Sequence, residues 1–452
     1  MRHRSIAGPL ILILIGGLFL LYNLRPELPI ADLISLYWPF LLIAWGLIRL
    51  VEVVVSFSRA TPMRRVFSGG EIWLVVLICL FGSAMFAAHR HGFRFGVRGM
   101  EMFGEAYDYP VNARKDVGAV RRVVFENLRG NVRVSGADAP EIRITGHKSI
   151  RALRRADADA ADRNSAVDIV AEGDTVVVRT NQERVSENQR ISTDLDAAVP
   201  RGVSVELRGR FGDYDLSDLA GNVEISSDRA DVRLVRIGGD ARVDLRRSDI
   251  VRMAEVKGNV DLQGRGNEVE LENIAGQVTI SGSYGGTMAF KNLAKPLHFE
   301  SSNTDLRVEA LPGQISMDLA EFAARNVVGP MRLVTKTRDV KIENFTNALD
   351  LETERGDIEL LPTRLPLAKI EARSRSGKIE LTLPAQAAFQ LQASTDHGEA
   401  VNDFGPPIQK QTEGRSASLK GTVGAGPVIH LSTQRGSIAV RKAGVGTAEA
   451  QL

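Results

Sequence analysis

The feature that most constrains this chain is a short hydrophobic pattern that recurs between residues 120 and 442. In each copy, apolar residues occupy positions j, j+2, j+9 and j+11. A spacing of two indicates a strand with one buried face, and the longer step leaves room for a turn between two such strands. Nine segments fit the pattern, and they begin at Val167, Val205, Val223, Val260, Leu297, Met331, Leu349, Ile370 and Ile429.

The spacing of these segments predicts how they are arranged. In the central part the units recur about every 18 residues. A fixed short period is typical of a solenoid, because two short strands cannot bury their apolar face alone and must stack on neighbouring units. The sequence therefore predicts an all-β solenoid, or β-helix. The period is marked by Gly221, Gly239, Gly258 and Gly276 and, in the equivalent place, by Lys295, Gly313 and Gly329.

Two kinds of turn are predicted within each unit. One contains an asparagine, which tolerates left-handed backbone geometry and bonds to nearby backbone. The other reads Ser/Thr-x-x-Gly, where the glycine can adopt a positive φ. We expect the stacked asparagines to support the turns rather than to bind a ligand. The turn residues are Asn127, Asn273, Asn292 and Asn344, and the segments Thr353 to Gly356, Ser374 to Gly377 and Thr433 to Gly436.

Two segments depart from the repeat. Residues 148–163 are rich in alanine and charge, and they predict a surface helix inserted between strands. Residues 404–427 are rich in glycine and proline, and they predict a loop. The solenoid domain is accordingly expected over residues 101–452, with its repeats at about 120–442.

Residues 1–100 predict a membrane anchor. Three apolar stretches, at 6–24, 33–55 and 72–88, each have about the length that a helix needs to cross a bilayer. A secretory signal peptide is a poorer interpretation of the first stretch, because no A-x-A-like cleavage site follows and a second stretch comes soon after it.

The arginines of the short loops predict the orientation of this anchor. Arg2 and Arg4 precede the first span, and residues 59–65 between the second and third spans contain three more arginines. Because cytoplasmic loops are enriched in basic residues, the N-terminus is expected inside. Three spans then place the solenoid outside the cytoplasmic membrane. Arg90, Arg94 and Arg98 beyond the third span favour the opposite orientation.

Composition excludes several classes of protein. Residues 1–100 have a net charge of +6 and the remainder a net charge of −4 with interspersed signs, so nucleic acid is not an expected partner. The single cysteine, Cys79, rules out a disulfide framework and a cysteine-rich zinc site.

Two segments resemble known bacterial families. The stretch GPLILILIGGLFLLYNL, followed by LYWPFLLIAWGLIRLV, resembles the transmembrane region of LiaI/LiaF-like envelope-stress proteins. The segments VVFENLRGNVRVSG and ETERGDIELLP resemble the repeats of a bacterial adhesin-like domain of unknown function, over roughly residues 105–442. This resemblance implies a β-helix-like module that is often attached to LiaF-like membrane segments.

The search for catalytic chemistry identifies no site. No HExxH, Walker A, G-x-S-x-G or nucleotide-binding pattern is present, so no catalytic, cofactor-binding or metal-binding residue is assigned. We expect an envelope module, without catalysis or cofactors, that acts in adhesin-like binding, stress sensing or scaffolding. Its expected partners are the lipid bilayer, envelope proteins or cell-wall glycans, and other copies of the solenoid. The alternative is a polysaccharide-active β-helix enzyme that uses paired carboxylates such as Asp213 and Asp215.

Overall fold

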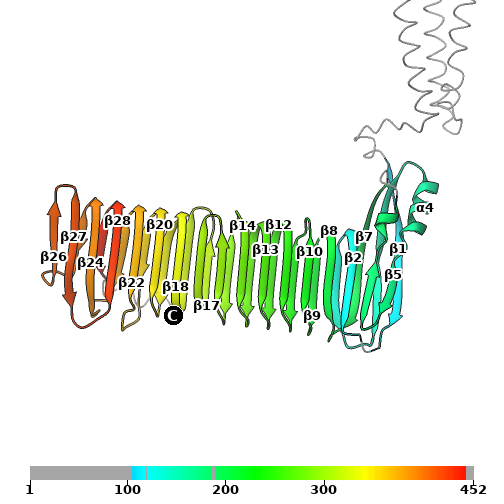
Figure 1. Cartoon of the computed structure of the whole chain (residues 1–452), viewed down its shortest axis with the longest axis horizontal. Helices are drawn as coiled ribbons and strands as arrows, with labels where there is room; N and C mark the ends of the chain where they lie inside the picture. The colour runs from blue at the N-terminus through cyan, green and yellow to red at the C-terminus, as the bar shows by residue number, and fades with distance from the viewer. Residues whose placement is uncertain (1–103, 119, 186–188, 444–452) are drawn as a thin grey trace, which may run out of the picture. The chain divides into compact units, whose positions relative to one another are not determined.

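The computed structural model describes residues 104–118, 120–185 and 189–443 (Figure 1). The three predicted membrane spans lie outside the described residues. Among the residues that are described, no helix has the length and apolar character needed to cross a membrane. Residues 103–452 form a single unit, and its strands lie side by side in one long series.

The strands pair in two rows, here called sheet A and sheet B. Both belong to one network of 29 strands, because four long strands continue from one sheet into the other. These are β12 (Ala241–Val256), β13 (Val260–Ile274), β17 (Thr304–Met317) and β18 (Glu321–Thr337).

Apart from the long strands, sheet A contains, in spatial order, β5 (Asp168–Glu172), β6 (Thr175–Arg179), β2 (Arg122–Arg129), β8 (Ser204–Phe211), β10 (Val223–Ser227), β14 (Val278–Tyr284), β16 (Leu297–Ser301), β20 (Leu349–Arg355), β22 (Ile370–Ser376), β28 (Val428–Arg435), β24 (Phe389–His397), β27 (Ser416–Val423) and β26 (Ile408–Glu413). Sheet B contains β1 (Glu105–Asp116), β4 (Glu141–Ala152), β7 (Arg190–Pro200), β3 (Val132–Ala137), β9 (Tyr214–Leu219), β11 (Val232–Ile237), β15 (Met288–Leu293), β19 (Asp339–Phe345), β21 (Ile358–Leu361), β23 (Ile379–Leu383), β29 (Ile438–Lys442) and β25 (Ala400–Asn402).

The regular coils confirm the predicted strand phase. Val223 and Ile225 of β10, and Val232 and Leu234 of β11, are at most 2% exposed. β10 pairs in parallel with β8 and β12, and β11 pairs in parallel with β9 and β12. Each coil therefore gives one strand to each sheet. The inward side chains of both sheets form one continuous core, which confirms an all-β, solenoid-like fold.

Two of the nine matching segments are hairpins rather than coils. Leu297 of β16 lies opposite Val308 of β17 in an antiparallel pair, and Ile169 of β5 lies opposite Val178 of β6. The prediction of stacked coils is wrong at these two places. A tight hairpin also puts apolar residues at j, j+2, j+9 and j+11 on one face, so the spacing alone cannot separate the two arrangements.

The antiparallel segment interrupts the solenoid in its middle. β17 runs antiparallel to β15 and β16, and β18 returns antiparallel to β17 before parallel stacking resumes with β19 and β20. Both β17 and β18 pass through sheet A and sheet B. Gly329 lies where β18 passes from sheet B to sheet A, two residues before the inward Met331, as Gly221 lies before Val223. Gly313 lies where β17 passes in the opposite direction, from sheet A to sheet B, so it is not an equivalent of the earlier glycines.

Those earlier glycines lie where neighbouring coils approach most closely. A Cβ on Gly239 would lie 2.7 Å from the carbonyl oxygen of Gly221, and a Cβ on Gly276 would lie 2.1 Å from that of Gly258. No larger residue fits at these distances, because real Cβ contacts of this kind are longer than 3 Å. The period of about 18 residues therefore arises because the same tight turn occurs once in each coil.

The predicted asparagine turns are confirmed at three of four positions. Asn273, Asn292 and Asn344 have φ values of 58°, 53° and 52°. Asn127 is an exception, because it is fully buried and its amide donates hydrogen bonds to the carbonyl oxygens of Gly130 and Thr193. Other coils place different residues in the left-handed position, namely Asp218, Arg236, Glu255 and Asn326.

The ends of the solenoid differ from the predictions in two places. The inserted helix α4 spans Arg155–Asn164, whereas Lys148–Ala152 belong to β4, where Lys148 and Ile150 are buried between β1 and β7. The segment 404–427 is not a loop, because β26 and β27 form an antiparallel hairpin at the edge of sheet A. A short 3-10 helix, η2, spans Gln182–Arg184.

Candidate functional site

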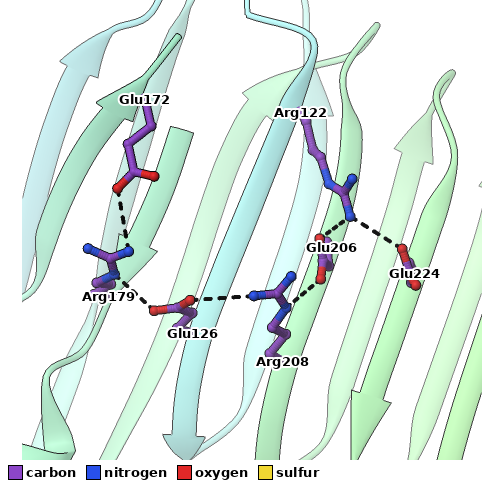
Figure 2. Close-up of polar contacts among 7 residues, drawn as sticks. All are labelled: Arg122, Glu126, Glu172, Arg179, Glu206, Arg208 and Glu224. Atoms are coloured by element: carbon purple, nitrogen blue, oxygen red, sulfur yellow. Dashed lines mark hydrogen bonds and ion pairs between the residues drawn. The ribbon is translucent and has the colours of Figure 1, made fainter. Parts of the chain in front are cut away.

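Alternating charges cover the outer face of sheet A near its N-terminal end (Figure 2). Glu126 of β2 lies opposite Arg179 of β6 on one side and Arg208 of β8 on the other. Its carboxylate is 2.9 Å from Nε of Arg179 and 3.7 Å from Nη1 of Arg208. Arg179 also reaches Glu172, with Nη2 3.4 Å from Oε1. Like the strands, these charges are held in register by the sheet.

Glu206 continues this network across the sheet (Figure 2). Its side chain is 8% exposed and forms ion pairs with both Arg122 and Arg208. Arg122 in turn approaches Glu224 of the next coil, with Nη2 3.4 Å from Oε2. Every carboxylate in the figure has a guanidinium partner, so the network ties five strands together and leaves little uncompensated charge for a ligand.

The two carboxylates of the enzyme hypothesis line a shallow groove on the outside of sheet B. The groove has a volume of about 460 Å³ and contains Asp213 and Asp215 together with Asp194, Asp231 and His147. The structure thus brings several acids near one another. An acid can act in catalysis only if its carboxylate is not already engaged in hydrogen bonds or ion pairs of the fold.

Asp213 takes part in a ladder of hydrogen bonds that joins successive turns. Asp213 donates its backbone N–H to Oδ1 of Asn131 at 2.9 Å, and its own carboxylate accepts the backbone N–H of Asp231. Oδ1 of Asp231 accepts the N–H of Asp249 at 2.9 Å in the next coil. A second ladder has the same geometry, with Oδ1 of Asn222 bonded to the N–H of Asp240 at 2.9 Å.

The surroundings of Asp213 also shift its pKa. Burial raises the pKa of this carboxyl, and the nearby charges of Asp231 and Asp194 raise it further. Asp215 has a different environment, because it lies on the strand face with Oδ2 3.9 Å from Nε of Arg133. One acid is therefore engaged in a turn and the other in an ion pair.

The described residues contain no group of side chains that could form a metal-binding site. In residues 104–118, 120–185 and 189–443, no three His, Cys, Asp or Glu side chains are placed to hold a metal ion. His147 lies in the groove, where Nε2 is 3.3 Å from Oδ2 of Asp194.

One buried polar cluster, at the N-terminal end of the core, was not predicted from the sequence. Nε2 of Gln182 in η2, which has two hydrogens to donate, lies within hydrogen-bond distance of three oxygens: Oδ1 of Asn127 at 3.1 Å, the carbonyl oxygen of Arg129 at 2.7 Å and Oγ1 of Thr193 at 2.9 Å. Gln182, Asn127 and Thr193 are at most 6% exposed. Each polar group finds a partner, so the cluster closes the end of the core. The available signal in the sequence was the pair of polar residues Asn181 and Gln182, which come soon after the apolar run of β6.

Together these features define a class of protein: a β-solenoid with tightly hydrogen-bonded turns and charged outer faces, joined to an apolar N-terminal segment. The chain belongs to the Toastrack DUF4097 family, whose model matches residues 115–441. The model of the LiaF transmembrane domain matches residues 7–102. Both resemblances found in the sequence are confirmed, and the chain is membrane-associated.

Three solved structures are similar to this chain at low sequence identity. A candidate cell adhesion protein from Clostridium sporogenes is 8% identical, with a TM-score of 0.17, over 75% of this chain and 100% of that one. A candidate adhesin from Bacteroides fragilis is 10% identical, with a TM-score of 0.22, over 74% and 97%. A candidate lipid binding protein from Parabacteroides distasonis is 11% identical, with a TM-score of 0.19, over 73% and 96%. No functionally curated sequence matches the chain.

Proposed function

We propose that this chain is a multi-pass protein of the bacterial cytoplasmic membrane that presents its solenoid on the extracytoplasmic side. The observation that carries the proposal is the presence, in one chain, of a LiaF transmembrane match and a Toastrack match. Three spans at 6–24, 33–55 and 72–88 would form the anchor. The arginines at the N-terminus and between the second and third spans favour a cytoplasmic N-terminus.

The solenoid acts, in this proposal, by contact and without catalysis, as an adhesin-like or stress-sensing module. The support comes from the groove on sheet B, where the carboxylate of Asp213 accepts a turn hydrogen bond and that of Asp215 faces Arg133. Stacked coils offer long, regular surfaces suited to extended ligands and to partner proteins. Envelope proteins, cell-wall glycans and further copies of the solenoid are the partners it would contact.

Protease accessibility tests the orientation. Protease added to intact spheroplasts is expected to remove the solenoid and to leave a fragment containing residues 1–100. Spheroplasts that have been lysed serve as the control, because both sides of the membrane are then open to protease. A solenoid that is protected in intact spheroplasts and cut after lysis would reverse the orientation.

The groove supports a second candidate, a polysaccharide-active enzyme, because five carboxylates line it, among them Asp213 and Asp215. The intact protein in detergent is incubated with cell-wall glycans and acidic polysaccharides, and bond cleavage is followed. We expect no turnover. Turnover that disappears in both Asp213→Asn and Asp215→Asn would establish the enzyme instead.

A further inference from the structure

Several turns that lead from sheet B to sheet A hold one residue other than glycine in the left-handed backbone region. Strand register places these residues in line along one edge of the solenoid, in two runs on either side of β17, because the residues that flank them pair in successive coils. We call this set the left-handed row. Its φ values lie between 52° and 60°, and its members are Asp218, Arg236, Glu255, Asn273, Asn292, Asn326 and Asn344.

The row contains two residues that do not suit its backbone. Left-handed geometry is unfavourable for most L residues, whereas asparagine and aspartate tolerate it because their short side chains bond to nearby backbone. Arg236 and Glu255 are the exceptions, and they occupy successive coils. Residues held in this region gather at functional sites, where the surrounding structure maintains the strain. This part of the edge is therefore the place to look for a ligand site.

A groove of about 490 Å³ lies at these two exceptions. Its lining includes four successive members of the left-handed row, namely Asp218, Arg236, Glu255 and Asn273. The small residues Ala220, Gly238 and Ala275 also line it, where larger side chains would fill the space. Neighbouring strands are about 4.8 Å apart, so the groove extends roughly 14 Å from its first coil to its fourth.

The charges of the groove compensate one another. The charged residues of the lining are Arg201, Asp218, Arg236, Glu255 and Lys257. Arg236 donates to both carboxylate oxygens of Asp218, at 2.7 Å and 2.8 Å, and Arg201 lies 3.2 Å from Oδ1 of Asp138. Among the residues that the structure describes, Glu255 and Lys257 have no opposite charge within 4.0 Å. One acid and one base are thus left over, and the groove has no excess of either sign.

We propose that this groove binds a linear, uncharged polysaccharide of the cell envelope. A sugar hydroxyl both donates and accepts hydrogen bonds, so it matches a lining in which carboxylate, guanidinium, amide and ammonium groups adjoin. The coil spacing of about 4.8 Å is close to the length of one sugar residue in an extended β-linked chain, so such a chain stays in step with the coils. Binding would also account for Arg236 and Glu255 at positions where asparagine fits the backbone better.

Other polymers match this groove less well. A polyanion would meet the carboxylates of Asp218 and Glu255, and a polycation would meet Arg236 and Lys257. Single-stranded nucleic acid stacks on aromatic side chains, and none of the described residues in the lining is aromatic. The inference supplies a ligand class for the contact role under the proposed function, and it rests on that role.

The test compares three forms of the full-length protein in a detergent without a sugar headgroup. The groove variant carries Arg236→Asn and Glu255→Asn, which place in both coils the residue found elsewhere in the left-handed row. The control variant carries Arg247→Asn and Glu268→Asn, which also remove one exposed base and one exposed acid, at the turns on the opposite edge of neighbouring coils. Neither variant changes the net charge.

Calorimetry measures binding of chitotetraose and cellotetraose, with polygalacturonate and single-stranded DNA as charged probes, and thermal unfolding measures stability. Wild type and control variant are expected to bind at least one of the two tetrasaccharides, and to do so equally well at low and high salt. The groove variant should bind it about tenfold more weakly. Its melting temperature should equal or exceed that of wild type, because asparagine tolerates the left-handed backbone.

Three results would overturn the proposal. The first is a wild type that binds neither tetrasaccharide, or that binds only the charged probes. The second is equal weakening in the groove and control variants. The third is a groove variant that melts lower than wild type and binds as well, since Arg236 and Glu255 would then serve stability alone. Because orientation is measured separately by protease, a failure here leaves the membrane proposal to its own test.

Discussion

Arg338 is buried in the solenoid at the position where the next coils have glycine. It is 4% exposed, and its guanidinium donates to the carbonyl oxygen of Asp318 and to the hydroxyls of Thr304 and Thr335. Burial lowers the pKa of Arg338, which reflects the cost of holding a charge there. Thr304 lies in β17, Thr335 in β18 and Asp318 in the turn between them, so this side chain connects the antiparallel segment to the first coil that follows it.

Removing this guanidinium tests its role at the level of one residue. Arg338→Met should lower the free energy of unfolding by about 2 kcal/mol, because buried acceptors lose their donor. Arg355→Met, one coil further on at an exposed position, should change it by less than about 0.5 kcal/mol. Denaturant unfolding of both variants gives the comparison. Equal effects would mean that the buried hydrogen bonds contribute nothing specific.

Asp213 makes stability depend on pH. Its folded pKa is raised, so the folded state holds this proton more tightly than the unfolded state does. Stability contributed by the proton is present at low pH and lost as pH rises through the folded pKa. Asp213→Asn keeps an oxygen acceptor without the charge, and at neutral pH it should stabilise the protein by about 0.5 kcal/mol, since the half-exposed site is screened.

The difference between Asp213→Asn and wild type should shrink as pH falls below about 4, where the aspartate is also neutral. Melting temperatures from pH 3 to pH 8 measure it. Asp240→Asn is the matched control, because Asp240 has the same ladder position but lies between Asn222 and Asn259. A gain in the control as large as that in Asp213→Asn would show that neighbouring acids are not the cause.

At the scale of the element, the stability of each coil depends on the closeness of its turns. Gly377 has a φ of 156°, and a Cβ there would lie 2.0 Å from the carbonyl oxygen of Gly356. Gly377→Ala should therefore destabilise the protein by more than about 2 kcal/mol. Gly285, between β14 and β15, has nothing within 4 Å of its Cβ position.

Gly285→Ala is the control for this turn and should change stability by less than about 1 kcal/mol. Both variants are compared by thermal unfolding of the full chain. If Gly377→Ala were tolerated as well as Gly285→Ala, the stacked turns would be looser than the distances indicate.

At the scale of the whole molecule, the last two strands in sequence order, β28 and β29, do not lie at the end of the stack. β28 pairs in parallel with β22 on one side and β24 on the other, and β29 lies between β23 and β25 in the same way. The last coil in sequence is thus inserted between two earlier ones (Figure 1). The hairpin of β26 and β27 then covers the outer edge of β24.

This insertion predicts an unusual response to truncation. Removing residues 428–452 takes out an interior coil, so β24 to β27 lose their parallel partners and should lose hydrogen-exchange protection together. Removing only residues 444–452 should leave that protection unchanged. A normal solenoid would lose a terminal coil and keep the one before it. Protection of β24 in the longer truncation would contradict the observed strand order.

The sequence by itself determined which side chains face the core and where the tight turns lie. The alternation of apolar residues along a strand, as at Val223 and Ile225, follows from strand geometry. The glycines of the tight turns, such as Gly239 and Gly377, follow from close backbone contact. Both rules act over a few residues. The same local rules could not separate a coil from a hairpin at Leu297, because both place apolar residues at identical spacing.

Only the tertiary structure decided which strands are neighbours. The insertion of β28, the antiparallel interruption at β17 and β18, and the burial of Arg338 depend on contacts between segments far apart in sequence. The groove at Asp213 has the same origin. Stacking places residues from successive coils about 5 Å apart, so charges that are dispersed along the chain become hydrogen-bonded ladders or ion pairs according to the register of the strands.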